Sequence, residues 1–236
     1  MARPNNSGGS NLKWFYLLLG VIVVVGVGLM IYGGRKGSGS QASMQPVDLA
    51  ALDARALMEK AKGVRIGPDS ARVQVMLFSD YTCPGCAHFT NSIEPQLLQE
   101  FVETGRIQFI AYDFPLGGAS HVHGFLAARA ARCAEDQGKF WEYHKQLMAA
   151  QAAWAFSASA PIEQLQSYAA QLGLDANAFS TCLNSDQHAE LVTANYQLGQ
   201  QAGVNSTPTV FVGPRQSLGS LDWDVLRAEI RRALGD

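Results

Sequence analysis

The chain has 236 residues, of which 47% are hydrophobic and 16% charged, and its formal net charge is -2. This composition is typical of a folded protein rather than a disordered one. The near-neutral charge argues against a nucleic-acid-binding protein, which needs clustered Lys and Arg. The length allows one good-sized domain with an additional segment.

The N-terminal region differs in composition from the rest. Residues 1–13 are small and polar and predict a short disordered tail. Residues 14–32 carry no charge, and a helix of about 19 residues spans roughly 28 Å, close to the apolar thickness of a bilayer. Aromatic residues at both ends are typical of a membrane interface. We therefore predict a single transmembrane anchor, followed by a flexible Gly/Ser-rich linker at residues 33–46.

A cleaved signal peptide is the alternative, because Ser40-Gln41-Ala42 has the small residues of a cleavage site. Basic residues flank the apolar span on both sides, so charge does not decide its orientation. The four cysteines suit an oxidising compartment. We expect a single-pass protein of the cell (inner) membrane, with residues 47–236 facing the periplasm or the cell exterior.

The region from residue 47 onward begins with patterns of both helix and strand. The expected elements are, in order, a helix over 47–62, a buried strand over 72–78, a helix over 86–105 and a second strand over 106–114. Pro95 should kink the second helix, because it cannot donate a backbone hydrogen bond.

From about residue 120 to 203 the pattern is helical throughout, which predicts a helical insertion in the α/β core. The expected helices cover 121–137 and 140–152, then one opened by Pro161, one from the N-cap Asp175 to Leu183, and one capped by Ser185 or Asp186 that ends at Gly203. The core then resumes with a strand after Pro208, a turn over 213–216, an edge strand over 217–219 and a final helix capped by Ser220.

The motif Cys83-Pro84-Gly85-Cys86 lies where the first strand ends and a helix begins. Free backbone N–H groups and the positive end of the helix dipole would stabilise Cys83 as a thiolate, the form that attacks disulfides. Pro84 suits the first helical position. A C-x-x-C pair in this place predicts a thioredoxin-like redox site.

Other uses of the motif were weighed. Structural zinc usually needs a second pair of ligands at matching spacing, and Cys133 and Cys182 form no second C-x-x-C. An inert disulfide remains possible in principle, as does delivery of Cu(I), although no Met/His-rich tract accompanies the pair. We expect redox exchange by Cys83 and Cys86, with no metal and no cofactor.

Several segments, taken in order, resemble the DsbA-like thiol–disulfide oxidoreductases of the thioredoxin superfamily, in a membrane-anchored form. They are Leu77–Cys86, Tyr112–Leu116, Ala131–Ala134, Gly138–Trp141, Cys182-Leu183 and Thr207–Val212. The resemblance covers roughly residues 64–234. It implies an α/β thioredoxin fold with an inserted helical subdomain, preceded by the transmembrane helix.

The resemblance also implies roles for residues outside the motif. Thr207 and Pro208 would form a cis-proline loop that faces the cysteines, with Thr207 pairing with substrate backbone. Cys133 and Cys182 would form a structural disulfide, and closing a loop of about 50 residues could stabilise the fold by about 4 kcal/mol. Two free thiols and a second redox pair are the alternatives.

Two departures from the family pattern concern proton transfer. The buried acid that many thioredoxin-like proteins carry six residues before the first cysteine is replaced by Leu77. Asp80 is nearer but is expected to be exposed at the strand end, so the group that deprotonates Cys86 stays open. Pro84-Gly85 also lacks the histidine often found between DsbA cysteines, and His88 reads as an ordinary exposed helix residue.

The expected function is a disulfide-forming oxidase of extracytoplasmic proteins. An exposed Cys83 would form a mixed disulfide with a client, and the more buried Cys86 would resolve it. The partners implied are unfolded or reduced secreted proteins and a quinone-linked membrane reoxidase; we expect a monomer that binds no nucleic acid. The alternatives are a reductase or isomerase of the same fold, or a tethered peptide-binding chaperone.

Overall fold

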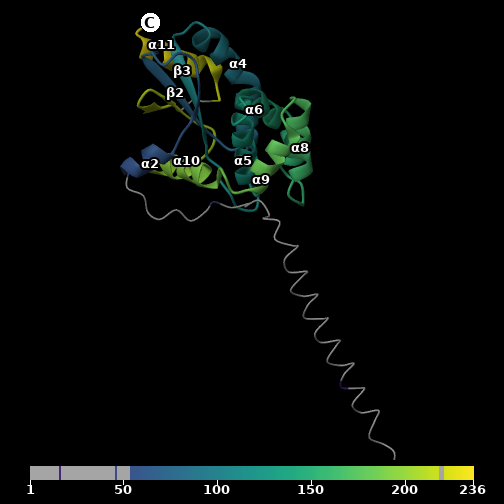
Figure 1. Ribbon diagram of the computed structural model, residues 1–236. Coiled ribbons are helices and arrows are strands. Elements are labelled where there is room, and N and C mark those ends of the chain that lie inside the picture. Colours follow the sequence, from purple (N-terminus) through teal and green to yellow (C-terminus); the bar gives the residue numbers. More distant parts are fainter. Residues whose placement is uncertain (1–15, 17–45, 47–53, 218–220) are drawn as a thin grey trace, which may run out of the picture. The chain divides into compact units, whose positions relative to one another are not determined.

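The computed structural model describes residues 16, 46, 54–217 and 221–236 (Figure 1). The predicted tail, anchor and linker, residues 1–46, therefore lie outside the described residues except at two positions. Among the described residues, no helix is both long enough and apolar enough to cross a membrane.

A five-stranded mixed sheet forms the centre of the domain, in the order β1-β3-β2-β4-β5. The strands are β1 (Val64–Ile66), β2 (Val73–Ser79), β3 (Ile107–Asp113), β4 (Thr209–Val212) and β5 (Arg215–Gln216). β2 and β3 are parallel, and the other neighbouring pairs are antiparallel. The apolar runs in β2 and β3 fit this central position, where both faces of a strand are covered.

One face of the sheet is covered by the helical segment that follows the C-x-x-C motif and by the last helix. These are α3 (Pro84–His88), the π-helical η1 (Phe89–Ile93), α4 (Glu94–Leu97), the π-helical η2 (Leu98–Val102) and α11 (Trp223–Leu234). They bury apolar side chains such as Phe89, Leu97 and Leu226 against the sheet. Pro95 lies in the first turn of α4, between two π-helical segments, so the predicted helix over 86–105 is not a regular α-helix.

The remaining helices form a bundle beside the sheet and cover its other face (Figure 1). They are α2 (Ala54–Lys60), α5 (Gly124–Glu135), α6 (Phe140–Ala149), α7 (Gln151–Trp154), α8 (Ile162–Gln171), α9 (Ala176–Asn184) and α10 (Ala189–Gln201). α10 packs against α2 and β3, while α5 packs against α6 and α9. The bundle has its own apolar core, which includes Leu126, Tyr143, Leu147 and Trp154.

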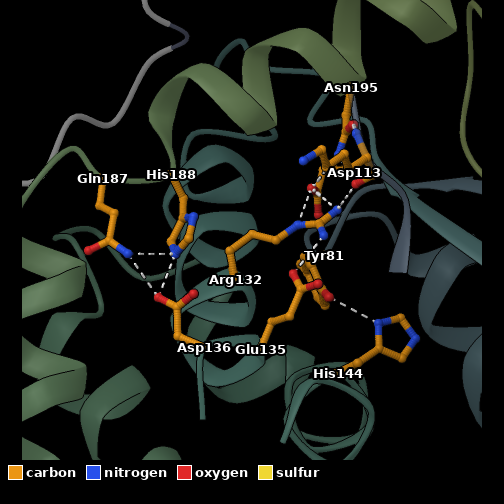
Figure 2. A network of polar contacts seen from close by, with 10 residues as sticks. Tyr81, Asp113, Arg132, Glu135, Asp136, His144, Gln187, His188 and Asn195 are labelled. Atoms are coloured by element: carbon orange, nitrogen blue, oxygen red, sulfur yellow. Dashed lines mark hydrogen bonds and ion pairs between the residues drawn. The ribbon is translucent and has the colours of Figure 1, made fainter. Parts of the chain in front are cut away.

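A buried ion pair joins the helices to the sheet (Figure 2). Nε of Arg132 on α5 donates to Oδ2 of Asp113 at the end of β3 over 2.8 Å, and Nδ2 of Asn195 on α10 donates to the same oxygen over 2.8 Å. Arg132 also donates to the backbone carbonyl of Lys62 over 3.0 Å. Because buried charges need such partners, this network fixes α5 and α10 against the central strands.

Several predicted boundaries are wrong for local reasons. The turn predicted over 213–216 needs only Gly213 and Pro214, so β5 already begins at Arg215 and the strand predicted over 217–219 is misplaced. The cap of α11 is Asp222, whose side chain accepts from the N–H groups of Asp224 and Val225; Ser220 lies outside the described residues.

In the helical bundle, Asp175 is the N-cap of α9 as predicted, and its carboxylate accepts from the N–H of Ala178 over 2.8 Å. α10 begins only after His188, because Ser185 and Asp186 belong to a turn that precedes the helix. The expected α/β thioredoxin-like fold, with a mixed sheet and helices, is confirmed, while β1 was not predicted because three residues carry almost no pattern.

Candidate active site

Cys83 and Cys86 lie at the junction between β2 and α3. Cys83 is the N-cap residue of α3, in an extended conformation, and Pro84 is the first helical residue, as the motif predicts. Both cysteines are free thiols. The sulfur of Cys83 lies 3.3 Å from the backbone oxygen of Thr207, and the sulfur of Cys86 lies 3.4 Å from the backbone nitrogen of Asp80. The two sulfurs thus contact the two chain segments that flank the motif.

Cys83 is more covered than the sequence predicts. Its exposed fraction is 9%, against the exposed thiol that was expected, while that of Cys86 is 1%. The cover comes from the proline loop: a Cβ atom at Gly85 would lie 3.1 Å from Cδ of Pro208 and 3.7 Å from Sγ of Cys83. The order of burial is as predicted, and a client sulfur must reach Cys83 through this small exposed fraction.

The two thiols have opposite tendencies to ionise. Hydrogen bonding to the Cys86 thiol lowers the pKa of Cys83 from 9.0 to about 5; partial burial opposes this, and Thr207 and the N–H groups of Cys86 and Gly85 add to it. Burial, followed by the neighbouring Cys83 sulfur, raises the pKa of Cys86 well above its usual value. At neutral pH the pair therefore holds one thiolate, on Cys83, and one thiol, on Cys86.

Thr207 and Pro208 lie beside Cys83 at the start of β4. The peptide bond between them is cis, as the family resemblance implies. Both residues are half-buried. Because β4 pairs with β2, the proline loop is held next to the end of the strand that leads into the motif. The backbone of Thr207 is therefore positioned at the attacking sulfur.

Asp80 is buried, and the prediction that it is exposed is wrong. Its exposed fraction is 1%. Its carboxylate accepts from the N–H of Thr82 over 2.8 Å, from Oγ1 of Thr82 over 2.7 Å and from the N–H of Leu116 over 2.8 Å. These donors lie in the motif turn and in the loop after β3, and they make burial of the charge affordable. Asp80 therefore fixes the shape of the turn that carries Cys83.

His121 completes this cluster, although the sequence analysis gave it no role. Its Nδ1 lies 3.2 Å from Oδ2 of Asp80 and 2.8 Å from Oγ1 of Thr82. His121 is 39 positions from Thr82 along the chain, so no local pattern links them. The available signal was Asp80 itself, because an acid beside a buried strand end needs polar partners from elsewhere.

A second polar network supports the motif from within the helical bundle. The Tyr81 hydroxyl lies 3.0 Å from Nδ1 of His144 (Figure 2), and Nε2 of His144 lies 3.3 Å from the buried carboxylate of Glu94. Nε2 of Gln151 donates to the backbone oxygens of Tyr81 and Cys83, over 2.8 and 2.9 Å. The turn before α3 is thereby held on both sides, which limits how far Cys83 can move.

The other predicted residues lie apart from this cluster. Cys133 and Cys182 form a disulfide that joins α5 to α9, with a Cα–Cα distance of 5.8 Å, which is the pairing that the resemblance implies. His88 is exposed on α3, as predicted. Leu77 is buried in the apolar core, so no acid occupies that position.

Comparison with known proteins adds relatives of two kinds. The family model described as Thioredoxin matches residues 59–232. The Na(+)/H(+) antiporter NhaA of Herminiimonas arsenicoxydans is 33% identical over 156 residues, which are 66% of this chain but 23% of the antiporter. The chain thus spans about a quarter of the length of the first curated relatives. Disulfide bond formation protein D of Bacillus subtilis is 25% identical, over 72% of this chain and 76% of its own.

Solved structures show the same fold. BdbD from Bacillus subtilis, in its oxidised form, has a TM-score of 0.67 and 23% identity, over 84% of this chain and 99% of its own. The α-DsbA1 protein of Wolbachia pipientis has a TM-score of 0.66 and 20% identity, over 79% and 94%. The chain therefore belongs to the thioredoxin family, and its predicted resemblance to the DsbA-like thiol–disulfide oxidoreductases is confirmed.

Proposed function

We propose that this chain is a thiol–disulfide oxidoreductase that works as an oxidase and passes the Cys83–Cys86 disulfide to other proteins. The observation that carries the proposal is the lowered pKa of Cys83, about 5, beside a buried Cys86. A stabilised thiolate favours the reduced form of the pair, which makes its disulfide a stronger oxidant. The value lies between about 7 for thioredoxin and about 3.5 for a strongly oxidising relative.

The exchange has two steps. A client thiolate attacks the Cys83 sulfur of the oxidised pair, the bond between Cys83 and Cys86 breaks, and Cys86 leaves and takes up a proton. A second client thiolate then attacks the client sulfur of the mixed disulfide and releases Cys83 as a thiolate. The client gains one disulfide, and its two electrons remain on the reduced pair. Cys83 is the good leaving group of the second step because its pKa is low.

The proposal extends to cellular context. Clients would be unfolded or reduced secreted proteins, and a quinone-linked membrane protein would accept the electrons and restore the disulfide. The uncharged run at residues 14–32 supports a membrane anchor, with the described domain on the periplasmic or outer side. The printed name of the Bacillus subtilis relative, a disulfide bond formation protein, supports the oxidising direction.

Trapping of the intermediate tests the proposal. The oxidised protein, mixed with a reduced two-cysteine peptide, should convert the peptide dithiol to a disulfide with one peptide oxidised per chain. Cys86→Ser should accumulate a mixed disulfide with an oxidised peptide through Cys83, whereas the matched variant Cys83→Ser should accumulate none. Turnover that survives Cys83→Ser would contradict the enzyme assignment and favour a peptide-binding chaperone.

A further inference from the structure

A second cluster of sulfur, nitrogen and oxygen donors lies beside the Cys133–Cys182 disulfide, in the helical bundle. The two sulfurs and a ring nitrogen of His188 all lie within 4.8 Å of one another. Cys133 comes from α5, Cys182 from α9, and His188 is the N-cap residue of α10. Three helices thus contribute one donor each to a single point.

Asp136 supplies a fourth donor at the same point. It follows the last residue of α5, and its Oδ2 lies 2.8 Å from Nε2 of His188 and 3.7 Å from Sγ of Cys182. Nε2 of Gln187 donates to the same oxygen over 3.0 Å, so the carboxylate is held toward the cluster (Figure 2). The donor set is therefore two sulfurs, one imidazole nitrogen and one carboxylate oxygen.

The burial of these four groups changes in order from inside to outside. Cys133 is 1% exposed and Cys182 is 8% exposed, whereas the side chains of His188 and Asp136 are 14% and 41% exposed. An ion that arrives from solvent would meet Asp136 and His188 first and the sulfurs behind them. The cluster therefore has both a protected end and an open side.

We propose that reduction of the Cys133–Cys182 bond turns this cluster into a metal site that takes zinc. Zinc prefers four ligands in a tetrahedron, drawn from thiolate, imidazole and carboxylate, at about 2.0–2.3 Å, which places neighbouring donors roughly 3–4 Å apart. The measured separations of 2.8 and 3.7 Å around Asp136 are of that size. Nε2 of His188 would exchange its contact with Asp136 for the metal, and the freed sulfurs would separate to accept it.

The chemistry balances with a dithiol as reductant. A dithiol, such as a reduced client or dithiothreitol, gives two electrons and two protons to the disulfide and becomes a disulfide itself. Zinc then binds the two sulfurs as thiolates and releases those two protons. The helices α5 and α9 remain cross-linked in both states, by a covalent bond or by the metal. This inference does not depend on the proposed function of Cys83 and Cys86.

The test uses a chain in which the other two thiols are removed. Cys83→Ser/Cys86→Ser protein, reduced with dithiothreitol that is then removed, is mixed with zinc chloride and passed through a desalting column. We expect about one zinc per chain in the reduced protein and none in the oxidised one, with a higher Tm for the zinc-bound form. His188→Asn and Asp136→Asn should each weaken zinc binding tenfold or more, while His88→Asn, at an exposed site on α3, should not.

Two results would overturn the inference. One is a reduced protein that retains no zinc; the other is His188→Asn protein that binds zinc as tightly as the His88→Asn control. If reduction alone unfolds the chain, the readout becomes helical circular dichroism after zinc is added. Zinc should then restore the folded signal in the parent and in His88→Asn but not in His188→Asn, and equal recovery in all three, or none, would refute the site.

Discussion

At the scale of single residues, Asp80 is the buried acid of this site. The family position at Leu77 carries no charge, yet a carboxylate three residues before Cys83 is fully enclosed and accepts from Thr82 and Leu116. Its own backbone nitrogen lies 3.4 Å from the Cys86 sulfur. Asp80 thus links the ionisable pair to the loop after β3, and its partner His121 reaches the surface.

Replacement of Asp80 should destabilise the fold. In Asp80→Asn one of the two carboxylate oxygens becomes a donor that faces N–H groups, so a buried hydrogen bond is lost and a like group opposes it. We expect a loss of about 1–3 kcal/mol in the free energy of unfolding, measured by urea denaturation. Asp224→Asn, at an exposed position on α11, is the control and should change stability by less than about 0.5 kcal/mol. Equal effects of the two substitutions would contradict the role given to Asp80.

Cys83 should make the stability of the reduced protein depend on pH. Its pKa is about 5 when folded and 9.0 at its ordinary value, so the folded state holds the thiolate more readily than the unfolded one. The stabilisation is complete above about pH 9 and is lost as the pH falls toward about 5. The difference in Tm between the reduced protein and reduced Cys83→Ser should therefore grow from pH 5 to pH 8.5. A difference that is constant over this range would show that the thiolate is not stabilised.

At the scale of elements, α10 is fixed by a close approach to the end of β3. A Cβ atom at Gly199 would lie 2.5 Å from a ring carbon of Phe114 and 3.0 Å from one of Phe78, both in the buried aromatic cluster. No room remains for a methyl group, because the neighbours are themselves packed against the sheet. Gly199 is therefore needed for the contact, in spite of the low helix propensity of glycine.

Gly199→Ala should destabilise the protein although alanine is the better helix former. The forced shift of α10 or of Phe114 should cost about 1–3 kcal/mol, more than the gain of about 1 kcal/mol in helix propensity. Thermal unfolding of the oxidised protein measures the change. Gln200→Ala, at the exposed neighbouring position, is the control and should be neutral. A variant at Gly199 that is more stable than the parent would show that the helix is free to move.

At the scale of the whole molecule, the sequence predicts the types of the long elements better than their partners. The apolar runs of β2 and β3 and the cap at Asp175 are local signals, and they were interpreted correctly. β1 was missed because its three residues become a strand only by pairing with β3. Position in the sheet is decided by contacts that the local pattern does not contain.

The candidate site shows the same division. Cys83 and Cys86 could be found from a four-residue motif, and Thr207, Pro208 and the Cys133–Cys182 pairing from the resemblance to a family. The burial of Asp80 and its contact with His121 could not, because they arise when the loop after β3 folds back over the motif. The degree of cover over Cys83 likewise depends on a proline loop 124 positions away.

The reduction potential of the Cys83–Cys86 pair, measured by equilibration with glutathione, tests the central claim most directly. A thiolate stabilised as strongly as that of Cys83 predicts an oxidising pair, with a potential less negative than about -200 mV, between about -180 mV for protein disulfide isomerase and about -120 mV for DsbA. A value near about -270 mV, that of thioredoxin, would contradict the claim and make the protein a reductase.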